Sequence, residues 1–260
     1  MVDFTRQHYD SFTMPVSGVA VDYPSGHIVE PHSHPCVQLI YAIEGVLVIE
    51  SPTGRWVTPP SRGVWLQAGV EHSLRMRGAA RVRSLFVHSD IIDGMPQGNC
   101  VIDVSPLLRE LILAATEIEA PYESDSRDGR VMRLLLDELC VLPTLPLYLP
   151  WPDDDRIAHV CRSLTEQPQL SSTAQHWAQQ LAMSPKTFHR RFKHCTGVTF
   201  GRWRQQARLL LSLEFLAQGM PIMEVALQHG YDSQSAFSAA FKRQFGVAPS
   251  AFYQALAPIS

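Results

Sequence analysis

Four polar side chains between residues 32 and 72 have the types and spacing of a metal site. His32 and His34 are two residues apart and Gln38 follows four residues later, so on an extended strand all three point to one face. His72 comes from a later segment, AGVEH. Three imidazoles can hold zinc, nickel or ferrous iron. The pattern indicates a candidate site for a divalent transition metal.

The same histidines also fit a second interpretation, in which they line a pocket or are satisfied inside the fold without a metal. On either interpretation this pocket is where we expect a small-molecule effector. Tyr41, Trp56 and Trp65 are candidate aromatic walls, although such residues are more often plain core. Cys36 stands beside the histidines, and a small buried apolar role is the commoner one for a free cysteine.

The charges are divided unevenly along the chain, whose net charge is −3. Residues 168–260 hold 9 Lys and Arg against 3 Asp and Glu, which leaves 13 against 22 for the rest. The stretch between Glu166 and Glu214 has no acidic residue and contains Lys186, Arg190, Arg191, Lys193, Arg202, Arg204 and Arg208. A basic surface of this kind suits the phosphates of double-stranded DNA.

An internal repeat lies in the same region, at an offset of 49 residues. Ser184, Phe188, Phe192, Lys193, Gly197 and Val198 match Ser233, Phe237, Phe241, Lys242, Gly246 and Val247. Each copy predicts a helix that opens at Ser and buries two Phe at i and i+4, with a short helix before it. This is helix-turn-helix geometry, in which the second helix is held by its aromatic face and its other residues point towards a major groove.

The residues between the aromatic anchors are the candidate DNA contacts. Arg190 is the best candidate for a bidentate guanine contact, and the polar, uncharged second copy should add more modest readout. The full set of candidate DNA-binding residues is Lys186, Thr187, His189, Arg190, Lys193, Arg202, Gln234, Ser235, Ser238 and Lys242. A merely basic helical packing domain is the alternative, and the repeat argues against it.

The elements that position these residues suggest an α+β protein of more than one domain. Short β-rich runs from Val19 to Val87 predict a small sandwich or barrel, and residues 105–142 predict two amphipathic helices. The prolines of residues 142–152 predict a linker, after which the chain is helical. We expect a sensor domain at 1–102, a helical pair and linker at 103–152, and a DNA-binding domain at 153–260.

Composition excludes several other classes of protein. No run approaches the ~20 apolar residues of a membrane span, and the start, MVDFTRQHYD, lacks a signal-peptide core. Five scattered cysteines without a Cys-x-x-Cys pair argue against a disulfide framework or a cysteine zinc site. We therefore expect a soluble, cytoplasmic protein.

Two motifs carry a family resemblance. WAQQLAMSPKTFHRRFKHCTG and VALQHGYDSQSAFSAAFKRQFGVAPSAFY resemble the DNA-binding domain of AraC/XylS-type regulators, over about residues 155–256. The resemblance implies seven helices, with two recognition helices joined by a long helix at roughly residues 200–218 and inserted into successive major grooves. The family often has a long residue where Ala239 stands.

The histidine segment resembles the cupin motifs, which implies a cupin barrel or jelly roll for the amino-terminal domain. In metal-binding cupins the positions of His32, His34, Gln38 and His72 hold three His and a Glu. Gln38 stands in place of the Glu, and a neutral amide is a poorer ligand than a carboxylate. Ser61 and Gln67 replace the usual Gly and Pro.

Together these features most resemble AraC-type regulators of efflux-transporter genes. The function we expect is transcription regulation in response to a small-molecule effector, with RNA polymerase as a partner. A homodimer held by the helices of residues 105–142 is also expected, because family members often dimerise there. The alternative is a metal-dependent cupin enzyme with an appended helical domain, which the missing Glu weakens.

Overall fold

The computed structural model describes residues 14–58, 60, 62–91, 93–141, 144–145 and 148–251. They form two compact units. The first contains the described residues up to Ser51 and those from Thr58 to Leu145, and the second contains Pro52–Val57 and the residues from Tyr148 onward. Residues 142, 143, 146 and 147 of the expected linker lie outside the described residues.

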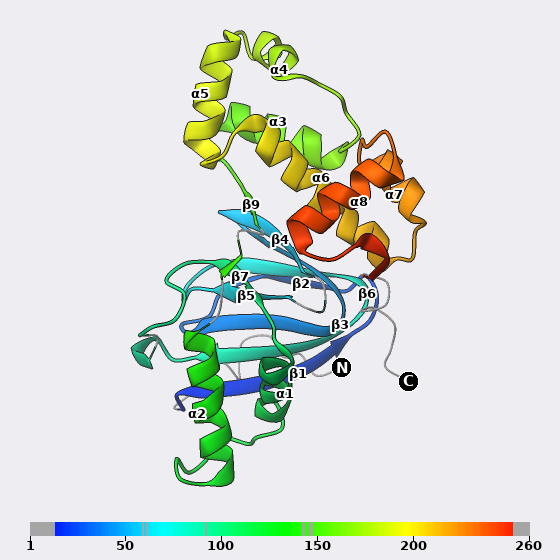
Figure 1. Cartoon of the computed structure of the whole chain (residues 1–260). Helices are drawn as coiled ribbons and strands as arrows, with labels where there is room; N and C mark the ends of the chain where they lie inside the picture. The colour runs from blue at the N-terminus through cyan, green and yellow to red at the C-terminus, as the bar shows by residue number, and fades with distance from the viewer. Residues whose placement is uncertain are drawn as a thin grey trace. The chain divides into compact units, whose positions relative to one another are not determined.

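The first unit is built on an antiparallel sheet with the strand order β1-β6-β3-β5-β7-β8, and β2 also pairs with β6 (Figure 1). A short 3₁₀ helix, Ser89–Ile91, follows β6. The small sheet-rich domain predicted from the sequence is confirmed. The strands are β1 Val16–Tyr23, β2 Ile28–His32, β3 Val37–Ser51, β5 Arg62–Leu66, β6 His72–Val87, β7 Cys100–Asp103 and β8 Thr144–Leu145.

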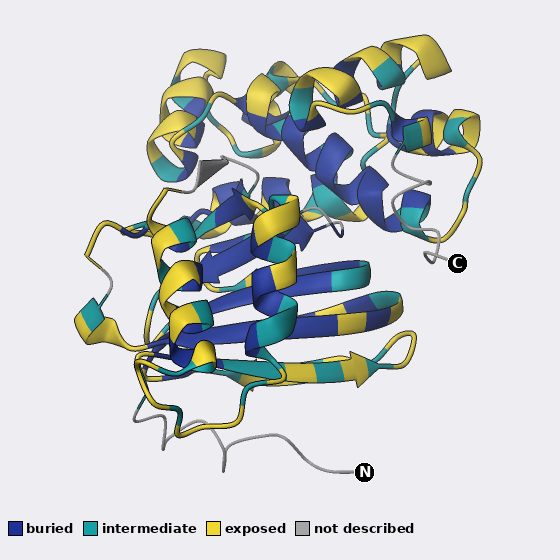
Figure 2. Cartoon of the chain, turned by 60° about the horizontal axis from the view of Figure 1, so that its bottom comes forward, coloured by how far each residue is buried: buried dark blue, intermediate teal, exposed yellow. Residues whose placement is uncertain are grey.

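Strand register separates two faces of this sheet. Leu39 stands opposite both Leu85 and Trp65, so these side chains share one face. Gln38 stands opposite Phe86, on the other face. The Leu39 face is covered by helices α1 Pro106–Ala115 and α2 Arg127–Cys140, the two helices expected there, and forms with them one buried core. Figure 2 shows the mostly buried strands β3 and β6 beneath the helices.

The expected aromatic walls do not surround the histidines. Tyr41 and Trp65 belong to the core under α1 and α2, on the sheet face opposite to that of Gln38. Trp56 belongs to the second unit, where its ring stacks on Tyr148 with centroids 6.2 Å apart. Strand parity explains the correction for Tyr41, because residues 38 and 41 differ by an odd number and so point to opposite faces.

One glycine lets α1 approach the sheet. A Cβ at Gly18 in β1 would lie 2.4 Å from the carbonyl oxygen of Ala115, at the end of the helix. Any other residue would push the helix away and open the buried core. Serines start both helices, since Ser105 and Ser126 accept hydrogen bonds from the backbone N–H of Leu108 and Gly129.

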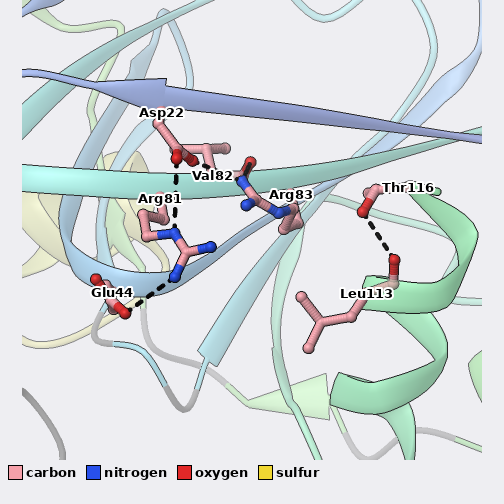
Figure 3. A network of polar contacts seen from close by, with 7 residues as sticks. All are labelled: Asp22, Glu44, Arg81, Val82, Arg83, Leu113 and Thr116. Atoms are coloured by element: carbon pink, nitrogen blue, oxygen red, sulfur yellow. Dashed lines mark hydrogen bonds and ion pairs between the residues drawn. The ribbon is translucent and has the colours of Figure 1, made fainter. Parts of the chain in front are cut away.

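A polar network joins β1, β6 and β3 (Figure 3). Arg83 Nη1 donates to Asp22 Oδ1 at 2.8 Å, and Arg81 Nη1 donates to Glu44 Oε1 at 3.3 Å. Arg81 Nε also lies 3.6 Å from Asp22 Oδ2. Arg83 is buried, but Asp22, Glu44 and Arg81 are largely exposed, and exposed ion pairs contribute only about 0–1 kcal/mol each. The register of these strands therefore depends mainly on the buried faces.

The second unit is helical, as predicted, and six helices lie within its described residues. The resemblance implies seven helices, and residues 252–260 lie outside the described range. No described helix is both long and apolar enough to cross a bilayer. The elements are β4 Gly54–Thr58, β9 Leu149–Pro150, α3 Asp155–Glu166, α4 Ala174–Gln180, α5 Pro185–Thr196, α6 Phe200–Ala217, α7 Ile222–Gln228 and α8 Gln234–Phe245.

Candidate nucleic-acid interface and histidine cluster

The sequence repeat is also a structural repeat. Ser184 and Ser233 are the N-caps of α5 and α8, and each hydroxyl accepts the N–H three residues later. Gly197 and Gly246 end the two helices in the left-handed conformation, with φ of 74° and 80°. Glycine takes that conformation without the steric cost of a Cβ. The matched residues are therefore the start and stop signals of two equivalent helices.

Aromatic rings fix the buried face of α5. Phe188 and Phe192 are fully buried, and their ring centroids lie 5.7 Å apart. Both rings meet Phe200 edge to face, and Phe192 also meets Trp203 of α6 at 6.0 Å. In α8 the matching Phe237 and Phe241 are also fully buried. Each helix is thus held by a pair of aromatic anchors one turn apart.

The opposite face of α5 carries the predicted DNA contacts. Lys186, His189, Arg190 and Lys193 are exposed, and Thr187 is half-buried, and its hydroxyl lies 2.9 Å from that of Ser184. On α8, Gln234, Ser235 and Lys242 are exposed and Ser238 is half-buried. Arg202 is exposed in the first turn of α6. No described residue pairs with Lys186, Arg190 or Lys193, so these cations are available to phosphates or bases.

Other basic residues of the same stretch have structural partners. Arg191 forms an ion pair with Asp154, the N-cap of α3. Arg204 donates to the Ser172 carbonyl at 2.8 Å. Arg208 is half-buried and donates to three carbonyls, those of Pro168, Leu170 and Gly230, at 2.9–3.1 Å. Their charge therefore contributes less to a DNA-binding surface than the sequence count implies.

The structure brings the three histidines together. His32 ends β2, His72 opens β6 directly opposite it, and His34 lies in the turn before β3. Ring centroids are 4.5 Å apart for His32 and His72, 4.9 Å for His32 and His34, and 5.7 Å for His34 and His72. One ring nitrogen from each lies within 4.8 Å of the others. The predicted convergence of these side chains is thus present in the fold.

The surroundings keep two of these rings neutral. The pKa of His34 is lowered to about 4, mainly by burial and also by the neighbouring His32 and His72. Burial also lowers the pKa of His72 to about 4, against the hydrogen bond to the Val70 carbonyl, which favours the protonated form. At neutral pH both rings therefore keep a nitrogen lone pair.

Gln38 is buried on the sheet face that carries Phe86, opposite to the face covered by α1 and α2. Its Nε2 donates to the Ser84 hydroxyl at 3.4 Å, while its Oε1 is buried with no hydrogen-bond partner. The cross-strand partner Phe86 meets the His34 ring edge to face at 5.0 Å. Gln38 thus offers an unused acceptor on the strand face that also carries the His34 contact.

Two family models match the chain. A model described as a helix-turn-helix domain matches residues 177–255, and one described as an AraC-like ligand binding domain matches residues 15–184. The first match spans both repeated helices, and the second includes the histidine cluster.

Similar proteins include regulators from enteric bacteria. The HTH-type transcriptional regulator NimR of Escherichia coli K12 is 32% identical over 229 residues, which cover 88% of this chain and 84% of NimR. The arabinose operon regulatory protein of Salmonella typhimurium is 29% identical over 151 residues, 54% of this chain and 50% of that protein. Among solved structures, ToxT from Vibrio cholerae covers 94% of this chain and 100% of its own, with 12% identity and a TM-score of 0.40.

Proposed function

The chain belongs to the AraC family of transcription regulators, and we propose that it reads double-stranded DNA with the exposed faces of α5 and α8. One observation carries this assignment of residues: two matched helices with the same caps and buried aromatic anchors leave polar faces free. The α5 face is the more basic, so it should supply more of the affinity. The α8 face, with Gln234, Ser235 and Ser238, should supply more modest readout.

We expect Arg190→Ala to weaken specific binding and relax the preference at one base pair. Arg190 lies between Phe188 and Phe192, which turns it away from the aromatic face, and it is exposed. A bidentate arginine–guanine pair contributes about 1–3 kcal/mol of discrimination. Binding-site selection with the variant is the measurement, and the affected position should lose its preferred base.

Lys193→Ala and Arg202→Ala are the matched controls for this prediction. If they contact phosphates, all sequences should weaken alike, and each loss should flatten the log–log salt slope by about one unit. A sequence logo of Arg190→Ala that matches the wild type at every position would mean that Arg190 contacts phosphate. Base readout by α5 would then fall to Lys186 and His189.

For the first unit we infer that a small-molecule effector binds it and alters DNA affinity or contacts with RNA polymerase. The description of the matching model as a ligand binding domain supports this. An efflux-transporter gene is the target we propose, from the resemblance of the whole chain to regulators of such genes. Genome-wide footprinting tests it, since footprints away from any transporter gene would refute the target.

The apolar side chains left exposed on α1 and α2 support a homodimer. Leu107 and Leu134 are 49% and 44% exposed, although their neighbours Leu108 and Leu135 are fully buried against the sheet. Val141, directly after α2, is 74% exposed. Pairing two copies would remove this apolar surface from water. We propose that the α1–α2 pair is the dimer interface.

We expect Leu134→Glu to convert a dimer into a monomer, because the substitution places two carboxylates in an apolar interface. Light scattering at micromolar concentration is the measurement. Leu227→Glu is the matched control, since Leu227 is 55% exposed on α7 of the other unit and its substitution should leave the dimer intact. A wild-type monomer that binds DNA with full affinity would contradict the interface.

A further inference from the structure

His32, His34 and His72 lie together in the first unit and have no part in the proposed DNA contacts. We propose that His32, His34 and His72 bind one divalent transition metal through their ring nitrogens, with the Gln38 amide oxygen as the donor for a fourth position. Within the described residues, this is the one group of three or more His, Cys, Asp or Glu side chains whose ligand atoms converge.

The spacing of the ring nitrogens fits a shared ion. One nitrogen from each ring lies within 4.8 Å of the other two. Zinc–nitrogen bonds of about 2.0–2.1 Å put ligand nitrogens roughly 3.0–3.4 Å apart, a distance that small ring rotations would reach. Two of the three histidines are directly paired across β2 and β6, so the backbone already holds them together.

The hydrogen bonds of the rings orient the lone pairs. His32 Nδ1 lies 2.8 Å from the Glu30 carbonyl oxygen, and His72 Nδ1 lies 2.9 Å from that of Val70. A carbonyl accepts only, so each Nδ1 carries the proton, and in the neutral ring Nε2 is then the bare acceptor. Metal-binding histidines have this arrangement, with the second nitrogen donating to a backbone carbonyl or a carboxylate.

One of these acceptors is buried without a partner. His72 is 2% exposed, and its Nε2 has no hydrogen bond. Gln38 is 6% exposed, and its Oε1 is also buried without a hydrogen bond. Leaving a buried acceptor unsatisfied costs about 1–3 kcal/mol, so two in one region require a reason. A cation, which accepts lone pairs, would satisfy both.

The donor set limits which metals fit. Three imidazoles and an amide carry no charge, and the cluster has no carboxylate. Mg²⁺ and Ca²⁺ prefer oxygen ligands, usually with carboxylates, whereas Zn²⁺, Ni²⁺, Co²⁺ and Fe²⁺ accept imidazole. The site should therefore select nitrogen-preferring ions. Their binding would join the end of β2, the turn before β3 and the start of β6.

The test uses the full chain, stripped with a chelator and titrated with Zn²⁺ or Co²⁺. We expect one ion per chain by elemental analysis, Co²⁺ d–d absorption, and a higher Tm with Zn²⁺ because binding stabilises the folded state. His72→Ala and the double variant His32→Ala with His34→Ala should lose the ion. His88→Ala, at an exposed histidine of the same unit, should retain it.

A measurement on the wild type keeps the proposal testable if those variants fail to fold. Of the 11 histidines in the chain, three should show zinc-dependent shifts of their imidazole nitrogens by NMR, with the Nδ1–H tautomer at His32 and His72. Gln38→Glu places a carboxylate beside the ion and should lower the Kd. No ion on the wild type, or equal binding by His72→Ala and His88→Ala, would overturn the site, and an unchanged Kd for Gln38→Glu would remove Gln38 from it.

Discussion

Phe192→Ala should lower the free energy of unfolding of the DNA-binding unit by about 3–5 kcal/mol, the usual cost of removing a buried aromatic side chain. The Phe192 ring is fully buried and meets three other rings, those of Phe188, Phe200 and Trp203. These rings join α5 to α6. Removing the Phe192 ring takes away a large part of the 5–15 kcal/mol that stabilises a typical domain, and α5 loses its fixed orientation.

Thermal unfolding and DNA binding measure this effect together. For a unit of about 100 residues, 1 kcal/mol shifts Tm by about 4–8 °C, so a fall of more than about 10 °C is expected along with loss of specific binding. Phe192→Leu keeps most of the volume and is the matched control, with a smaller fall. An unchanged Tm for Phe192→Ala would mean that these rings do not hold α5.

The helices of the second unit were predictable because their signals are local. The sequence marks both ends of α5 and α8. Ser184 and Ser233 begin the two helices, and Gly197 and Gly246 end them. The same local signals occur at the shorter helices, since Pro221 directly precedes α7 and the Thr173 side chain caps α4. The resemblance to AraC/XylS-type regulators placed the long helix, which runs from Phe200 to Ala217.

Contacts between distant residues were not predictable in this way. The three carbonyls that Arg208 reaches lie 22 to 40 residues away, so its sequence position suggests only one more surface cation. The convergence of the histidines was predictable only in part: His32 and His34 are close in sequence, but they do not share the expected strand, because β2 ends at His32 and His34 lies in the connection before β3. The pairing of His72 with His32 depends on the strand register, which no short motif specifies.

The least predictable contact is an ion pair between residues 159 positions apart. Arg55 Nη2 donates to Glu214 Oε1 at 2.7 Å, and the two side chains are 21% and 5% exposed. Arg55 lies in β4, in the segment Pro52–Val57 that belongs to the second unit, and Glu214 lies in α6. Nearby, Trp203 and Gln206 of α6 donate to the carbonyls of Pro150 and Tyr148. The β4–β9 pair is thus fastened to α6.

Arg55→Met or Glu214→Leu alone should destabilise the second unit by about 3–5 kcal/mol, because each removes one side of a largely buried ion pair. Arg55→Met should have the larger effect, since it leaves the Glu214 carboxylate, which is only 5% exposed, whereas Glu214→Leu leaves the Arg55 side chain, which is 21% exposed. The double variant should recover much of that loss, since no buried charge remains and two apolar side chains can pack together. Denaturant unfolding of the four proteins measures the coupling free energy, and we expect it to exceed about 1 kcal/mol. If the losses of unfolding free energy simply add in the double variant, the two residues stabilise the unit independently. The β4–β9 pair would then be held to α6 by the hydrogen bonds of Trp203 and Gln206 instead.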